Sequence, residues 1–106
     1  MTNKDVILKS IRVIESNLKN NLKVLDVSNE VCYSFYHFIR LFHSITGYSP
    51  QSYLQKRRLS EAAIDLRDTQ KKIVDIAYEY QFGSPESFSR AFRKHFSINP
   101  TEVREG

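Results

Sequence analysis

The sequence predicts an all-α protein of seven helices, in which two helix-turn-helix units are joined by one long linker helix. Three observations support this fold class. Apolar residues recur at helical spacing, and no segment alternates in the way of a half-buried strand. Serine–proline and asparagine–proline pairs mark helix starts. A pattern of five residues also occurs twice along the chain, at identical internal spacing.

The N-terminal part of the chain predicts three helices. The first has apolar residues three or four positions apart, at Ile7, Ile11, Ile14 and Leu18. The second is short and carries Val24, Val27 and Val31. Ser34 is a typical N-cap for the third helix, and Gly47 is a typical terminator. The predicted core residues of the third helix are Phe38, Leu41, Phe42 and Ile45.

The remainder of the chain predicts four more helices. A long helix starts at Ser49-Pro50 and runs to about Arg67, with core positions at Tyr53, Leu59, Ala62, Ala63 and Leu66. A short fifth helix carries Ile73, Ile76, Ala77 and Tyr80. Ser84-Pro85 starts a sixth, with Phe88, Ala91, Phe92 and Phe96 inside. The run Asn99-Pro100-Thr101-Glu102 resembles a capping box and starts the last. We therefore expect three parts, namely residues 1–49, a linker helix at 50–67, and residues 68–106.

The internal repeat indicates what each half of the chain is. Ser34-x3-Phe38-x-Arg40-x-Phe42-x7-Pro50 recurs as Ser84-x3-Phe88-x-Arg90-x-Phe92-x7-Pro100. Upstream, Ser28, Val31 and Tyr33 match Ala77, Tyr80 and Phe82 at an offset of 49, so the second copy has one extra residue, near Gly83. A small residue in the first helix of each copy lets the second helix cross close to it. That is the geometry of a helix-turn-helix in a homeodomain-like bundle; the alternative is a duplicated hairpin used only for packing.

Composition narrows the classes of partner. Lysine and arginine total 16 against 12 acids, so the net charge is +4 and the pI about 9.3, which mildly favours a polyanion as the partner.

The single cysteine, Cys32, excludes an internal disulfide and a zinc site built on cysteines, and we expect it to pack in the core near a turn. We expect a cytoplasmic protein with no membrane segment, no cofactor and no metal. His37, His43 and His95 lack the spacing of metal ligands, and His37 and His95 are expected to pack against helices.

The outward faces of the third and sixth helices provide candidate DNA-reading residues. If the phenylalanines face the core, the opposite side of the third helix carries Tyr36, Ile39, Arg40 and His43. The sixth helix, where we expect His95 to face nearly inward, presents Glu86, Ser89, Arg90 and Arg93. Arginine reads guanine O6 and N7 with two hydrogen bonds, and an exposed isoleucine suits a thymine methyl group. A solvated or ion-paired arginine is the alternative, but the matched placement of Arg40 and Arg90 favours base reading.

Other residues are candidates for phosphate contacts. Ser34 and Ser84 lie at helix N-termini, whose unpaired N–H groups suit a phosphate oxygen. The candidate cations are Lys71, Lys72, Arg93 and Lys94. Lys56, Arg57 and Arg58 are ambiguous, and we expect one of the three to be structural.

Three segments resemble one known family. Residues 34–50, SFYHFIRLFHSITGYSP, resemble the first recognition helix and following turn of the AraC/XylS family. QKRRLSEAAIDL is similar to its linker helix, and IVDIAYEYQFGSPESFSRAFRKHFSINP to its signature segment. The resemblance covers essentially the whole chain and is nearest to the MarA/SoxS/Rob group, in which the domain binds as a monomer. It implies a DNA-binding domain of a bacterial transcription regulator, more often an activator, with RNA polymerase as a second partner.

The resemblance also assigns roles and shows departures. It implies contacts to bases and phosphates for the third-helix residues above, and for Pro85, Glu86, Ser87, Ser89, Arg90 and Arg93 in the sixth. Glycine is usual in the family where Gln81 stands, and Gly83 falls two places later, which suggests an altered turn in the second unit. Ser97 also replaces a frequent glycine. Glu86 replaces a more usual polar base reader, and it would repel phosphate unless it accepts from a cytosine amine.

The expected geometry suits two successive major grooves. A linker helix of 18 residues spans about 27 Å, and packed against both units it can hold two recognition helices about 34 Å apart, one DNA turn. The predicted site is asymmetric, about 20 base pairs of double-stranded DNA, and easier to engage when bent.

The rival prediction is a helical interaction module that contacts RNA polymerase or another regulator without reading bases. The sequence fits either a short stand-alone regulator or the front of a longer one.

Overall fold

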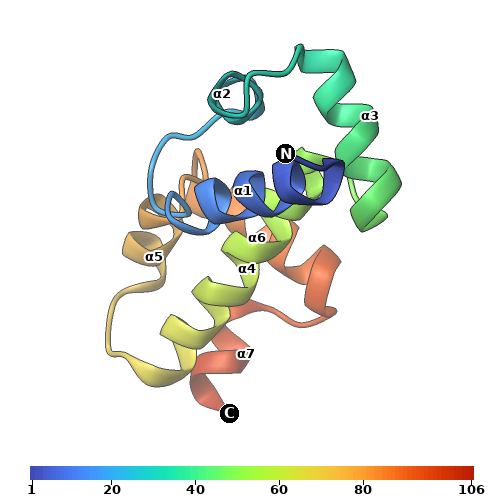
Figure 1. Cartoon of the computed structure of the whole chain (residues 1–106). Coiled ribbons are helices and arrows are strands. Elements are labelled where there is room, and N and C mark those ends of the chain that lie inside the picture. Colours follow the sequence, from blue (N-terminus) through green and yellow to red (C-terminus); the bar gives the residue numbers. More distant parts are fainter. The chain divides into compact units, whose positions relative to one another are not determined.

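The computed structural model describes all 106 residues and contains seven α-helices and no strand, which confirms the predicted fold class (Figure 1). The helices are α1 (Asn3–Glu15), α2 (Val24–Glu30), α3 (Phe35–Thr46), α4 (Pro50–Asp68), α5 (Ile73–Glu79), α6 (Pro85–Phe96) and α7 (Pro100–Glu105). The chain forms two compact units, Met1–Gln55 and Lys56–Gly106, so that α4 contributes to both. No helix is both long and apolar enough to cross a lipid bilayer.

The helix starts follow from side-chain caps. The Oγ atoms of Ser34, Ser49 and Ser84 accept backbone N–H groups three residues on, at 3.3, 3.1 and 3.1 Å, which confirms the three predicted caps. In the predicted capping box of α7, Glu102 accepts the N–H of Asn99 at 3.3 Å. A second capping box, between Thr2 and Asp5, starts α1 and was not predicted. Each of these bonds satisfies an N–H group that the helix itself leaves unpaired.

The first unit is built on three mutually packed helices. Helix α1 contacts α2 and α3, and α2 contacts α3 (Figure 1). The apolar stripe of α1 supplies Ile7 and Ile14 to the core, and α3 supplies Phe38 and Phe42, which are fully buried. The ring of Tyr53, in the first turns of α4, lies 5.6 Å from that of Phe42. This core fixes which side of α3 remains outside.

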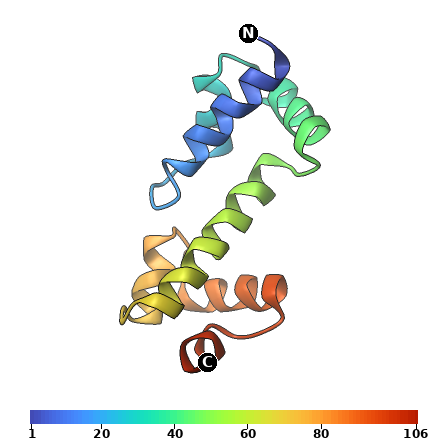
Figure 2. The ribbon, with the colours of Figure 1, turned by 60° about the horizontal axis from the view of Figure 1, so that its bottom comes forward.

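The second unit comprises the C-terminal part of α4 together with α5, α6 and α7 (Figure 2). Helix α6 contacts α5 and α7, and its Phe88 and Phe92 are fully buried. The Tyr80 hydroxyl donates to the Asp65 carboxylate at 2.8 Å and joins α5 to α4. From α7, the Arg104 guanidinium donates to the Leu66 and Lys71 carbonyls at 2.9 and 2.6 Å, where α4 ends. The bond to Leu66 satisfies a carbonyl that the C-terminus of α4 leaves free, and the bond to Lys71 holds the loop that follows α4.

Both helix-turn-helix units use the same turn. Cys32 and Gln81 adopt left-handed φ values of 61° and 68°. The next residue in each case, Tyr33 or Phe82, donates its N–H to the carbonyl of the small residue in the preceding helix, at 3.0 Å in both units. The extra residue of the second unit therefore follows Phe82 and is Gly83, as the offset predicts. The departure at Gln81 leaves the turn unchanged and places a non-glycine residue in a conformation that favours glycine.

Three predicted core positions are wrong. Ile45 is 41% exposed and its counterpart His95 is also exposed. The reason is that the last turns of α3 and α6 are exposed on almost every side, so facing the apolar direction brings no burial there. Cys32 is exposed because the left-handed residue of the turn points outward, and the preceding Val31 fills the core instead.

Candidate nucleic-acid interface

The exposed faces of α3 and α6 are equivalent by position. Every residue from Phe38 to Pro50 has the same degree of burial as the residue fifty positions later. Arg40 and Arg90 consequently lie at the same place on their helices, and both are exposed. Each unit carries a net charge of +2, since residues 1–55 have six lysines and arginines against four acids and residues 56–106 have ten against eight. Both units thus present an arginine to solvent from a mildly positive body.

The face of α3 carries a cation and rings without any acid. Tyr36 is 73% exposed, and Arg40 and His43 are exposed one and two turns further on. Arg40 forms no hydrogen bond or ion pair within the chain, so its five donors are available to another molecule. Ile39 is half-buried, so its side chain is less available to a thymine methyl group than predicted.

The face of α6 is more polar and includes an acid. Glu86 and Arg90 are exposed, whereas Ser87 and Ser89 are half-buried. Arg90 Nη2 donates to Ser87 Oγ at 3.5 Å. Glu86 lies in the first turn of α6, where a negative charge interacts favourably with the helix dipole. That interaction gives Glu86 a structural role that needs no DNA.

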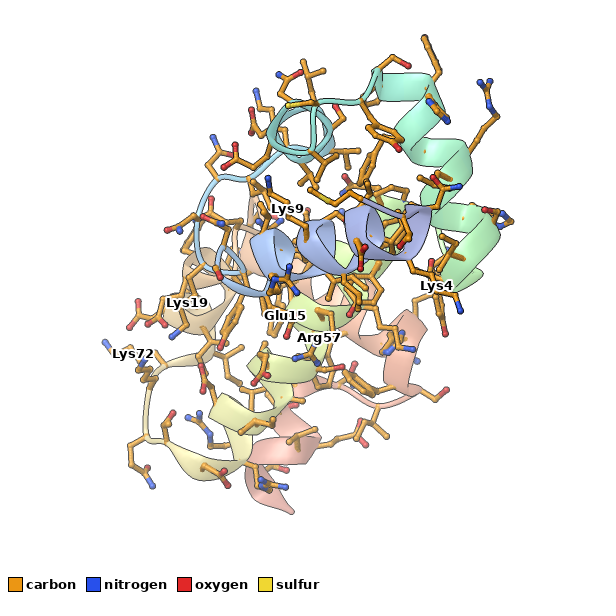
Figure 3. The ribbon with its side chains drawn as sticks, in the orientation of Figure 1. Lys4, Lys9, Glu15, Lys19, Arg57 and Lys72 are labelled. Carbon is orange, nitrogen blue, oxygen red and sulfur yellow. The ribbon has the colours of Figure 1, made fainter.

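The predicted phosphate contacts differ in availability. Arg93 and Lys94 are exposed and form no bond within the chain. Lys72 is exposed at the N-cap of α5 and points away from the ribbon (Figure 3). Lys71 instead pairs with Glu79, with Nζ and Oε2 3.2 Å apart. The Oγ atoms of Ser34 and Ser84 each accept a backbone N–H as helix caps. A phosphate at either helix start would therefore contact the remaining backbone N–H groups and the serine hydroxyl.

One cation with the same placement was missed in the sequence. Lys23 is exposed at the N-cap of α2, the position that Lys72 takes at α5. The offset of 49 that relates α2 to α5 pairs these two lysines, so the repeat contained the signal. Lys23 is therefore a further candidate for a phosphate contact.

The basic run in α4 is partly structural. Arg58 is buried, and its burial lowers the pKa of the guanidinium from its ordinary value. Arg57 Nη2 lies 2.9 Å from Glu61 Oε1, one turn away on the same helix. These contacts support the expectation that this run includes a structural arginine.

The histidines lie at the surface. His37 and His95 are exposed, which contradicts the predicted packing, although the His37 ring stacks on Tyr33 at 4.8 Å and the His95 ring meets Phe96 at 4.6 Å. A ring contact to one near neighbour leaves most of each imidazole in solvent. No group of three or more His, Cys, Asp or Glu side chains is arranged to hold a metal ion.

Comparison with known proteins shows the family to which the chain belongs. A family described as "Helix-turn-helix domain" matches residues 27–106. The crystal structure of an AraC-type DNA-binding domain-containing regulator from Chromobacterium violaceum superposes with a TM-score of 0.91 at 31% identity, covering 96% of this chain and 91% of that one. The chain belongs to the AraC-type family of transcription regulators. It is a DNA-binding domain of that family, whose fold and relatives are those of regulators and not of enzymes.

This AraC-type domain is similar to curated proteins of which it covers different shares. It is 44% identical to the Transposon Tn10 TetD protein of Escherichia coli over 95% of this chain and 70% of that protein. It is 40% identical to the transcriptional regulator Rob of Salmonella typhimurium, and 37% identical to the transcriptional activator AarP of Providencia stuartii. Both matches cover 86% of this chain, but they cover 32% of Rob and 67% of AarP. The AraC-type chain thus spans about a third of Rob.

Proposed function

We propose that this AraC-type domain binds an asymmetric DNA site by placing α3 and α6 in successive major grooves. Arg40 and Arg90 each read a guanine through O6 and N7. Tyr36, Ile39 and His43 contact bases or phosphates around α3; Glu86 and Ser89 do so around α6, and Ser87 lies between them and accepts from Arg90. The site is about 20 base pairs long, because two grooves on one face lie one helical turn apart.

The observation that carries this proposal is the matched exposure of two arginines on two capped helices. Arg40 has no partner in the chain, and Arg90 has only a long contact to Ser87. An arginine kept for stability would be bonded within the chain, as Arg57 is to the Glu61 carboxylate and Arg104 is to two backbone carbonyls. Two exposed arginines without an ionic partner, at equivalent places on two helices, suit the recognition of a polymer whose groups repeat.

Phosphate contacts would supply most of the affinity and set the register of the domain on DNA. Ser34 and Ser84 at the helix starts, Lys71 and Lys72 before α5, and Arg93 and Lys94 on α6 are the proposed contacts. We add Lys23, which takes the position of Lys72 in the first unit. Lys71 is the weakest of these candidates, because the approach of a phosphate would compete with its ion pair to Glu79.

A mobility-shift assay tests the proposal. Duplexes selected by the protein from a random pool are compared with random duplexes at two salt concentrations. We expect retention of the selected duplex at physiological salt and a specific-to-random affinity ratio of about 10³ or more. Equal affinities that both vanish as salt is raised would reject base reading and favour the rival interaction module.

The proposed partner besides DNA is RNA polymerase. The relative AarP is described as an activator, and an activator at a promoter contacts the polymerase. We therefore propose activation by a single copy of the domain bound to DNA, in the cytoplasm where bacterial DNA lies. Transcription in a purified system from a promoter that carries the selected site tests this, with a higher transcript yield expected when the protein is added. Sedimentation of the protein–duplex complex tests whether one copy is bound.

A further inference from the structure

The exposed side of α6 carries a chain of hydrogen bonds that runs from its cap to its central arginine. Ser84 Oγ accepts the Ser87 N–H at 3.1 Å and donates its own proton to Ser87 Oγ at 3.1 Å. Ser87 Oγ also accepts from Arg90 Nη2 at 3.5 Å. The three residues are spaced by three positions and therefore follow one side of the helix. A hydroxyl oxygen has two lone pairs, so Ser87 accepts from both neighbours at once.

The equivalent residues of α3 form no such chain. Ser34 Oγ accepts the His37 N–H at 3.3 Å, so the cap itself is the same. The His37 ring, however, stacks on Tyr33 with 4.8 Å between ring centroids, and Arg40 is left without any partner. From Phe38 and Phe88 onward the two helices match in burial, but at the preceding position Ser87 is half-buried where α3 has the exposed His37. A hydroxyl at this position can accept from the arginine three residues on, whereas the His37 ring turns to Tyr33.

We infer that Ser87 is a positioning residue, which sets base discrimination by orienting Arg90 and without itself reading the base. The inference rests on the proposed function of α6. A free arginine loses rotamer freedom when it binds, and a side chain held beforehand loses less. A guanidinium aligned before contact also favours the bidentate geometry that guanine requires over looser contacts to other bases. The 3.5 Å separation is long for a hydrogen bond, so Ser87 biases the orientation of Arg90 and does not lock it.

Ser87→Ala tests this cleanly because the cap uses the backbone N–H of residue 87, which the substitution keeps. Wild type, Ser87→Ala, Arg90→Ala and the double variant are titrated with the selected duplex and with single-base-pair substitutions of it. Arg90→Ala identifies the base pair that Arg90 reads. We expect Ser87→Ala to lower discrimination at that base pair alone by about two- to five-fold, and to have no further effect in the Arg90→Ala background. Ser87→Thr, which keeps a hydroxyl, should retain wild-type discrimination.

Other outcomes overturn the inference. An equal effect of Ser87→Ala with and without Arg90, or an effect at a different base pair, would show that Ser87 reads DNA directly. No change in discrimination on Ser87→Ala, with a normal loss on Arg90→Ala, rejects positioning and leaves the proposed function intact. If Arg90→Ala changes discrimination nowhere, base reading by α6 itself is rejected. The matched control is His37→Ala, which should leave discrimination at the base pair read by Arg40 unchanged.

Discussion

The two helix-turn-helix units have the same backbone plan and different surfaces. Both place two phenylalanines at the centre of the second helix, and both turn through a left-handed residue after the first. Their exposed faces share only the central arginine. Helix α3 surrounds Arg40 with rings, whereas α6 surrounds Arg90 with hydroxyls and Glu86. The comparison teaches that the duplicated buried positions maintain the fold, while the exposed positions around the shared arginine differ between the units and are free to set what each unit recognises.

The units also differ in how they are held together. In the second unit the hydroxyl of Tyr80 bonds the Asp65 carboxylate, but its counterpart in the first unit is Val31, which is buried and has no polar group. The C-cap residue is left-handed in both recognition helices, but it is Ser97 in α6 and Gly47 in α3. These differences make the units unequal in ways that substitutions can measure.

The largest expected effect is equal in the two units. Phe42→Ala and Phe92→Ala each remove a fully buried ring at equivalent positions, so each should lower the free energy of unfolding by about 3–5 kcal/mol. Urea unfolding of the whole chain measures it. Ile45→Ala, at an exposed position, is the control and should change stability by less than about 0.5 kcal/mol. A loss below about 1 kcal/mol in either phenylalanine variant would break the structural equivalence of the units.

The next effect is confined to the second unit. Tyr80→Phe removes the donor to the Asp65 carboxylate and should cost about 1.5–3 kcal/mol. Burial, followed by this bond, raises the pKa of Tyr80 above its ordinary value. The folded state therefore favours the neutral phenol. This contribution is complete below the unfolded-state pKa of about 10 and is lost as the pH rises from there toward the higher folded-state value.

Unfolding measured against pH checks this prediction. Wild type should lose stability above about pH 10 more steeply than Tyr80→Phe does. Parallel curves for the two proteins would mean that the bond to Asp65 contributes nothing that depends on the phenol proton.

The arginine comparison concerns DNA rather than stability. Arg40→Ala and Arg90→Ala should each reduce discrimination at one base pair by about 1–3 kcal/mol, at different base pairs of the selected site. Lys94→Ala, one turn from Arg90 and equally exposed, is the matched control. It should weaken selected and random duplexes alike and make the salt dependence shallower by about one unit. An arginine variant that behaves like Lys94→Ala would show that its arginine only positions the protein.

The smallest expected effect comes from exchanging the C-caps. Gly47 and Ser97 both have left-handed φ values, 79° and 65°, and nothing lies within 4 Å of a Cβ atom placed on Gly47. Gly47→Ser should therefore destabilise by about 1 kcal/mol through backbone strain alone, and Ser97→Gly should stabilise by a similar or smaller amount. Thermal unfolding of both variants checks the signs. Changes of the same sign in the two variants would contradict this explanation.

The sequence predicted local features of the fold well, because they depend on neighbouring residues. Serine caps, proline starts and the spacing of phenylalanines all act within one or two turns, and the observed helices follow them. The predictions for Ile45 and His95 were wrong because burial depends on how far the covering helices extend, which spacing along one helix does not reveal. The prediction for Cys32 was wrong because the left-handed conformation of this turn residue directs its side chain outward.

The candidate site was predictable in part. The repeat located Arg40 and Arg90 and also contained the signal for Lys23. Two features of the site could not be predicted without the three-dimensional positions of the side chains. The ion pair of Lys71 with Glu79 depends on two side chains eight residues apart, and the bond between Ser87 and Arg90 depends on the rotamer of a long side chain.

The proposal that α3 and α6 read one face of the duplex together is tested most directly by the affinity for a selected duplex with five extra base pairs at its centre. Five base pairs turn one half of the site by about half a helical turn, so one recognition helix would face away from its groove. If both helices read one face of the duplex, the insertion should weaken binding by about two orders of magnitude or more, toward the level of random DNA. Unchanged affinity would show that a single unit carries recognition and would contradict the account.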